Sequence, residues 1–91
     1  MEDFVGRQRR QMRMKIADYR RGALNLNAIV QQLEGLARVI GGSFWTDQVF
    51  PLVLELERIN SELIDKRREM TVKEQEIIEA TLRAIEALVA P

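Results

Sequence analysis

Apolar residues recur at helical spacing most clearly between Trp45 and Ile64. From residue 52 onward, one side of this stretch repeats at steps of three and four residues, as one face of an α-helix does. That side contains Leu52, Val53, Leu56, Ile59, Asn60, Leu63 and Ile64. The opposite side is polar, with Glu55, Arg58, Glu62 and Asp65. Because other segments must cover so apolar a face in water, the pattern predicts a central helix over about residues 51–68.

Two amphipathic helices are predicted before it. Met12, Ile16 and Tyr19 indicate a first helix from about residue 6 to 21, with residues 1–8 frayed because they show no clean period. A second helix, about residues 26–40, has an apolar face made of Leu26, Ile29, Val30, Leu33, Leu36, Ala37 and Ile40. Asn25 suits its N-cap, and Gly22 suits a left-handed C-terminal cap of the first helix. The short connection predicts an antiparallel hairpin.

A short extra turn or a kink is predicted before Pro51. Ser43 can cap a turn that contains Trp45. Pro51 has no N–H, and in a straight helix its ring would clash with the carbonyl of Asp47. Either a short helix ends near Phe50, or one helix is kinked there. We favour the break, since proline suits the first position of a new helix.

The last predicted helix, about residues 72–89, begins at a capping box formed by Thr71 and Glu74. Its main stripe is Ile78, Leu82, Ile85 and Val89, widened by Ile77, Thr81 and Leu88. No segment shows the alternation of a strand. The chain is therefore expected to be all-α, a compact four-helix bundle of antiparallel helices and a single domain over residues 1–91. Nearly full burial is predicted for Leu33, Leu56, Ile59, Leu63, Ile78, Leu82 and Ile85.

Charge is high but balanced, with 14 basic and 14 acidic residues. This balance does not indicate a nucleic-acid-binding protein. Residues 1–21 carry a net charge of +4 and the remainder −4, so we expect the basic first helix to lie beside an acidic helix. Glu79 and Arg83 are interpreted as a surface pair one turn apart. The absence of an apolar run of roughly 20 residues and of a signal-peptide core favours a cytoplasmic protein that does not span a membrane.

Catalytic residue types are scarce. The sequence has no histidine and no cysteine, which removes the commonest acid–base residue and the best nucleophile. Carboxylate-bridged metal sites in helical bundles also use histidine, so no metal or cofactor is expected. Residues 58–67, RINSELIDKR, bear a slight resemblance to the helical chorismate mutases, but their two Ile-Asx pairs stand five residues apart rather than the three of that family. A non-enzymatic protein is predicted.

A broader resemblance covers about residues 16–89. It rests on Tyr19-Arg20-Arg21-Gly22, Leu24-Asn25-Leu26, Leu33-Glu34-x-Leu36, Trp45 and Leu56-Glu57-Arg58-Ile59. These motifs resemble a group of small bacterial helical proteins, some of which look like immunity proteins that neutralise a co-encoded toxin. The resemblance implies a protein-binding module that occludes a toxin domain. Pro51 and the basic first ten residues depart from the group's pattern.

Two binding modes remain open. Acidic residues of the central helix and the turn after it, Glu55, Glu57, Glu62, Asp65 and Glu69, suit a basic partner. Alternatively, the surplus apolar residues Leu54, Ile64 and Leu88 favour a homodimer with a structural or regulatory role. Trp45 is interpreted as a core anchor, with an interface contact as the alternative. Gly35 lies on the far side of its helix, which indicates either a tolerant surface position or the close approach of another backbone.

Overall fold

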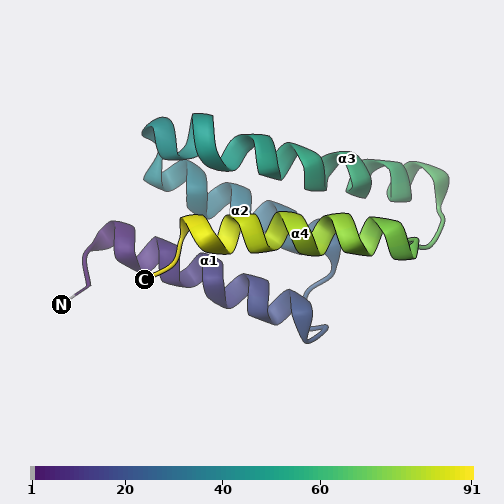
Figure 1. The fold of residues 1–91 in the computed structure, drawn as a ribbon, viewed down its shortest axis with the longest axis horizontal. Helices are drawn as coiled ribbons and strands as arrows, with labels where there is room; N and C mark the ends of the chain where they lie inside the picture. Colours follow the sequence, from purple (N-terminus) through teal and green to yellow (C-terminus); the bar gives the residue numbers. More distant parts are fainter. Residues whose placement is uncertain (1) are drawn as a thin grey trace.

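The computed structural model describes residues 2–91, which form four α-helices and one π-helical segment. In chain order they are α1 (Phe4–Arg20), α2 (Leu26–Ile40), η1 (Phe44–Val49), α3 (Phe50–Lys66) and α4 (Val72–Leu88), with no strand in these residues. The helices lie alongside one another, and both ends of the chain lie at the same end of the molecule (Figure 1). The predicted all-α class and the packing of four helices into a bundle are confirmed.

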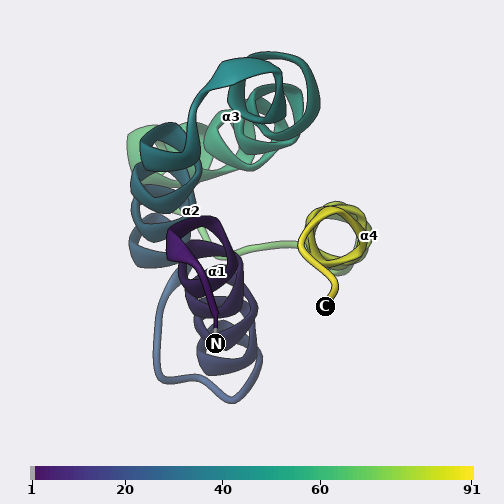
Figure 2. The ribbon, with the colours of Figure 1, turned by 90° about the vertical axis from the view of Figure 1, so that its left-hand side faces the viewer.

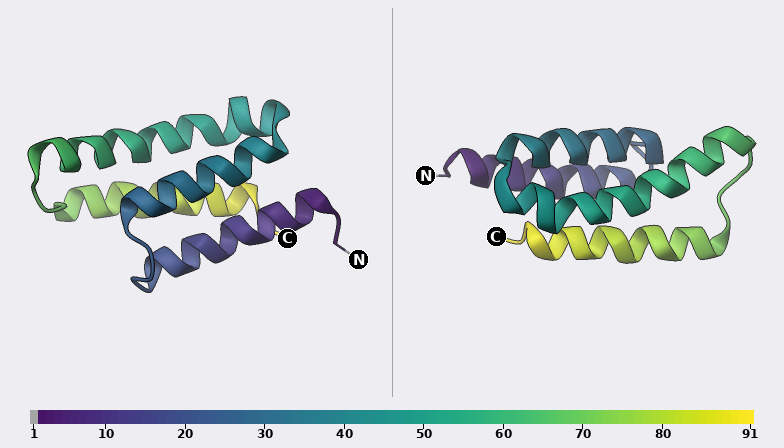
Figure 3. Two further views of the ribbon diagram at one scale, coloured as in Figure 1. Left: turned by 180° about the vertical axis from the view of Figure 1, so that it is seen from behind. Right: turned by 90° about the horizontal axis from the view of Figure 1, so that it is seen from above.

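The first three helices form a curved layer. Seen end-on, α2 lies between α1 and α3, and α4 lies on the inner side of the layer (Figure 2). The closest approaches of α4 to the other α-helices are to α1 and α3. The α3–α4 hairpin extends beyond the α1–α2 hairpin, so the last turns of α3 project past the ends of α1 and α2 (Figures 1 and 3).

Polar caps set the helix boundaries. The Asn25 side chain accepts from the Ala28 N–H at 2.8 Å, and α2 spans the predicted residues. Asp3 accepts from the Gly6 N–H at 2.7 Å, and α1 begins at Phe4, before the predicted start at about residue 6 and within the stretch expected to fray. Met1, part of that expectation, lies outside the described residues. The aspartate supplies a partner for one of the unpaired N–H groups of the first turn, which offsets the cost of Gly6.

The short helical segment predicted before Pro51 is present as η1, which ends at Val49, and Pro51 lies in the first turn of α3. The Phe50 N–H donates to the Trp45 carbonyl, five residues back, and the backbone stays helical from η1 into α3. The wide turn ends directly before Pro51, where the proline has no N–H to donate. Ser43 makes no capping hydrogen bond, because its own backbone is already helical (φ −66°, ψ −25°). The boundary before Pro51 is therefore a change from π-helical to α-helical hydrogen bonding, and the backbone is not interrupted there.

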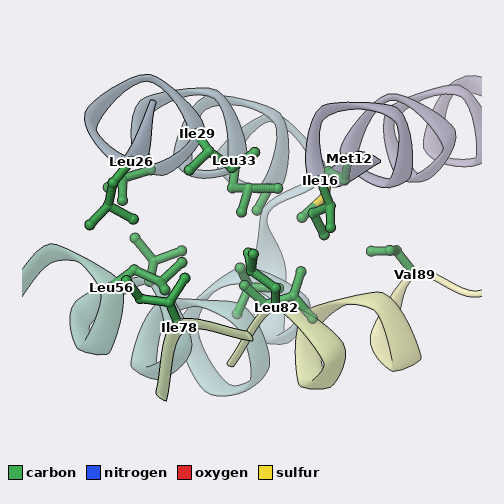
Figure 4. Close-up of a cluster of buried hydrophobic side chains, with 14 of the residues drawn as sticks. Met12, Ile16, Leu26, Ile29, Leu33, Leu56, Ile78, Leu82 and Val89 are labelled. Carbon is green, nitrogen blue, oxygen red and sulfur yellow. The ribbon is translucent and has the colours of Figure 1, made fainter. Parts of the chain in front are cut away.

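The core lies between the curved layer and α4. Its largest fully buried side chains include Met12, Ile16, Ile29, Leu33, Leu56, Ile78, Leu82 and Ile85 (Figure 4). Ile59 is also buried, but Leu63 is only half-buried and Ile64 is 57% exposed. Both were expected on the inner face. They miss burial because α3 projects beyond α1 and α2 at this point.

The buried side chains of Asn60 and Thr81 find partners within the chain, whereas the buried Nε of Arg9 has none. Asn60, predicted on the inner face of α3, is buried and donates through Nδ2 to Asn27 Oδ1 at 2.9 Å. The Thr81 hydroxyl donates to the Ile77 carbonyl at 2.8 Å. Both pairs avoid the free-energy cost of leaving a buried donor without an acceptor.

Truncation of Leu56 tests the core. Leu56→Ala should lower the free energy of unfolding by about 2–5 kcal/mol through lost burial and a cavity. Leu54→Ala, two residues away on the same helix, is the matched control, because Leu54 is 51% exposed and its loss should cost less than about 0.5 kcal/mol. Urea denaturation gives both values. Equal losses for the two variants would contradict the described orientation of α3.

Gly35 gives a second stability test. A Cβ built on this residue has no heavy atom within 4 Å, so the position is a tolerant surface site with no close backbone neighbour. Gly35→Ala should raise the free energy of unfolding by about 0.5–1 kcal/mol through helix propensity and a less flexible unfolded chain. Gly22→Ala should lower it instead, because Gly22 has φ of +84°. Thermal melts that show destabilisation by Gly35→Ala would contradict the open environment.

Candidate partner-binding surface on α3

The acidic residues expected to bind a partner lie along the outer side of α3 and in the turn after it. Glu55, Glu57 and Glu62 are half-buried on α3, whereas Asp65 and Glu69 are exposed. They share this surface with four cations: Arg58, Lys66, Arg67 and Arg68. The surface therefore has a mixed charge close to neutral, not the strongly negative field that the acidic residues alone would give.

Local pairs hold several of these acidic side chains. Glu55 pairs with Arg58, one turn further along α3. Glu62 pairs with Lys66 at 3.0 Å, and the hydrogen bond from Lys66 lowers the pKa of the Glu62 carboxyl. Such exposed pairs contribute little to folding stability, but they restrict the side chains to a few orientations.

Large apolar residues lie beside the charged positions. Phe50, Leu54 and Ile64 are 37%, 51% and 57% exposed and belong to one side of α3. Between them, the Ser61 hydroxyl donates to the Glu57 carboxylate at 3.2 Å. This side of α3 thus combines apolar area at both ends with a polar centre.

Trp45 extends the surface at the start of α3. It is half-buried and packs against the core, as expected for an anchor. Its ring also lies 5.2 Å from the Phe50 ring, and the Arg38 guanidinium lies 5.9 Å from its centroid. Trp45 therefore supports the core and also positions the partly exposed Phe50.

A second charged cluster joins α1 to α4. The Arg20 guanidinium donates to both oxygens of Glu86, at 2.6 and 2.7 Å, and lies 2.6 Å from the Glu79 carboxylate. These hydrogen bonds raise the pKa of Arg20 and lower that of Glu86. The predicted Glu79–Arg83 pair is wrong, because Glu79 is bound by a cation from another helix. The charge difference along the sequence indicated such neutralisation, but periodicity alone does not show which residues meet.

An open pocket of about 430 Å³ lies beside this cluster. It is lined by Tyr19, Arg20, Gln75, Ile78 and Glu79. Burial, followed by the charge of Glu79, raises the pKa of Tyr19. Since Arg20 and Glu79 already satisfy each other, the pocket presents no unpaired charge to a ligand. We interpret the cluster as a contact that orients α4.

Among residues 2–91, no three acidic side chains gather into a group that could hold a metal ion. Within the same residues, no helix is long and apolar enough to cross a membrane. No family model, curated protein or solved structure matched the chain.

The ion pair between Arg68 and Glu74 predicts a pH dependence of stability. Arg68 donates to both oxygens of Glu74, at 2.7 and 2.8 Å, and thereby lowers the pKa of Glu74 from 4.5 to about 2. A lowered pKa in the folded state stabilises the fold above pH 4.5, and this contribution is lost as the pH falls toward about 2.

Glu74→Gln tests this pair while keeping the capping box, because glutamine also accepts at that position. The variant should be less stable than the parent at pH 7. The difference should shrink below about pH 4.5 and almost vanish near pH 2. Urea denaturation at a series of pH values measures it. A difference that stays constant over this range would show that the charge of Glu74 contributes nothing.

Proposed function

We propose that the protein is a non-enzymatic protein-binding module whose contact surface is the outer side of α3. One observation carries this proposal: Phe50, Leu54 and Ile64 remain exposed on one side of a helix whose core face is buried. A surface that mixes apolar anchors with charged residues resembles protein interfaces, in which buried apolar residues supply most of the affinity and a polar rim supplies specificity.

The mechanism that fits this surface is occlusion. The four helices form a rigid support, and the pairs formed by Glu55 and Glu62 restrict side chains before the partner arrives. Such preorganisation reduces the entropy lost on binding. Exposed Asp65 and Glu69 favour a partner with basic groups at the matching positions.

The more specific form of the proposal is an immunity protein that covers a basic toxin domain. Its support is the resemblance to small bacterial helical proteins, together with the acidic residues on α3. A nuclease-like toxin that binds phosphate would present basic groups to such a surface. This proposal implies that the protein is bacterial and cytoplasmic and that its gene lies beside that of its toxin.

Charge reversal tests the surface. Replacement of Glu55, Glu62 and Asp65 by lysine should leave the fold nearly intact, because surface ion pairs contribute little to stability. Association with the product of the neighbouring gene should slow, and its salt dependence should flatten, since steering is screened beyond about 8–10 Å at physiological ionic strength. Stopped-flow association rates at several salt concentrations measure both effects.

A matched control separates a local effect from a change in net charge. Replacement of Glu34, Asp47 and Glu76 by lysine makes the same charge change on α2, η1 and α4. Slowing by the α3 variant alone supports the proposed surface, whereas equal slowing by both variants assigns the effect to net charge. No binding of the parent protein to the neighbouring gene product would contradict the immunity-protein proposal.

Self-association is the second candidate function. Exposure of Leu54 and Ile64 favours it, but Leu88, expected to contribute to the same contact, is half-buried and packs on the core. An interface through α3 would then pair two copies side by side with each fold unchanged. A monomeric mass by light scattering at high concentration contradicts this candidate.

A further inference from the structure

The turn between α3 and α4, residues 67–71, is built without glycine or proline. The other turns use Gly22, Gly41 and Gly42 at φ of +84°, +71° and +59°. In this turn Arg67 takes the left-handed conformation, with φ of +50° and ψ of +43°. It is the one non-glycine residue with positive φ in the described part of the chain. An L side chain is strained there, whereas arginine, glutamate and methionine are good helix formers.

The apolar faces of α3 and α4 are in phase across this turn. Steps of seven residues lead from Leu56 to Leu63, Met70 and Ile77, which share one face of a continuous helix. Ile78 and Ile85 fall beside them. If residues 67–71 became helical, α3 and α4 would therefore present a single apolar stripe instead of two unrelated faces.

The site that α4 occupies does not depend on this turn. Ile78, Leu82 and Ile85 are buried against the inner side of the α1–α2–α3 layer. Arg20 fixes the position of α4 through Glu79 and Glu86. Every one of these contacts can be made by the α4 of a second copy, because none involves residues 67–71.

We propose that residues 67–71 are a hinge and that the protein forms a domain-swapped dimer. In the dimer, α3, the hinge and α4 make one long helix, and each α4 occupies the inner side of the other copy's layer. The projecting α3–α4 hairpin places the hinge beyond the ends of α1 and α2 (Figure 3). Swapping preserves the contacts of α4 and is a recognised route to dimers through a short, strained hinge.

Four contacts hold the hinge closed in the monomer. The Thr71 N–H donates to Glu74 at 2.9 Å, and the Glu74 N–H donates to the Thr71 hydroxyl at 3.1 Å. Arg68 pairs with Glu74, and Met70 packs against the core. The equilibrium between monomer and swapped dimer therefore depends on two opposing effects. These contacts stabilise the monomer, whereas the strain at Arg67 and the helix propensity of the hinge favour the dimer.

Two hinge variants shift this equilibrium in opposite directions. Arg67→Gly relieves the strain in the monomer and weakens the continuous helix of the dimer. The association constant of the dimer should therefore fall at least about fivefold for each hinge. Thr71→Ala removes the cap of α4 and favours the continuous helix, so the constant should rise about fivefold for each hinge. The proteins are refolded from urea at high concentration and analysed by size-exclusion chromatography with light scattering, which separates 10.6 kDa from twice that mass.

A distance measurement distinguishes swapping from surface association. The chain has no cysteine, so Arg58→Cys with Ala80→Cys allows two spin labels at exposed positions on α3 and α4. The labelled protein is refolded with excess unlabelled protein. The distance between the two spin labels of one chain is then measured in the dimer fraction by double electron–electron resonance. A continuous helix places these residues about 33 Å apart, whereas the closed hairpin places them much nearer.

A long distance in the dimer, with opposite effects of the two hinge variants, is the expected result. A dimer that keeps the short monomer distance would assign association to another surface and overturn the proposal. A protein that remains monomeric after refolding at high concentration, in both the parent and Thr71→Ala, would overturn it as well.

Discussion

Coverage of the inner face of the α1–α2–α3 layer is the constraint on which this fold depends. The layer is curved, and α4 bridges α1 and α3 across its inner side. Ile78, Leu82, Ile85 and Val89 supply the buried contacts. At about 1.5–3 kcal/mol for each buried aliphatic side chain, they contribute roughly as much as the whole net stability of a small domain. Without α4, the three-helix layer would expose its core.

Charged contacts then fix where α4 lies along the layer. Apolar packing is not directional, so it does not by itself choose one register over the next. Arg20 engages Glu79 and Glu86, and Arg13 donates to the Val89 carbonyl at 2.5 Å near the end of α4. Two cations of the basic first helix are thus engaged in contacts with the end and the side of α4. This use is why the outer side of α3, with its exposed apolar residues, is the better candidate for an external partner.

Local signals in the sequence were sufficient for most of the secondary structure. The caps at Asn25 and Thr71 and the glycine at position 22 placed helix ends correctly, because each acts within a few residues. The exposure of Ile64 could not be predicted in this way, since it depends on how far α3 extends beyond two other helices. The Arg20–Glu79 contact was missed for the same reason: its partners are far apart in the sequence. At Pro51, the rule for proline placed the boundary between two helical segments, but it could not show that the first of them is π-helical.

The turn after α3 shows how tertiary contacts can override local preference. Residues 67–71 would extend a helix by their propensity, yet the capping box and the burial of Met70 reverse the chain here. The same overhang that leaves Ile64 exposed also leaves this turn free of α1 and α2. Both proposals therefore involve the C-terminal end of α3. In a swapped dimer, Ile64 lies three residues before the hinge and comes near the second copy. Phe50 and Leu54, at the opposite end of α3, stay available to a partner. Partner binding that survives dimerisation would thus depend on the Phe50–Leu54 end of α3, and binding restricted to the monomer would depend on Ile64.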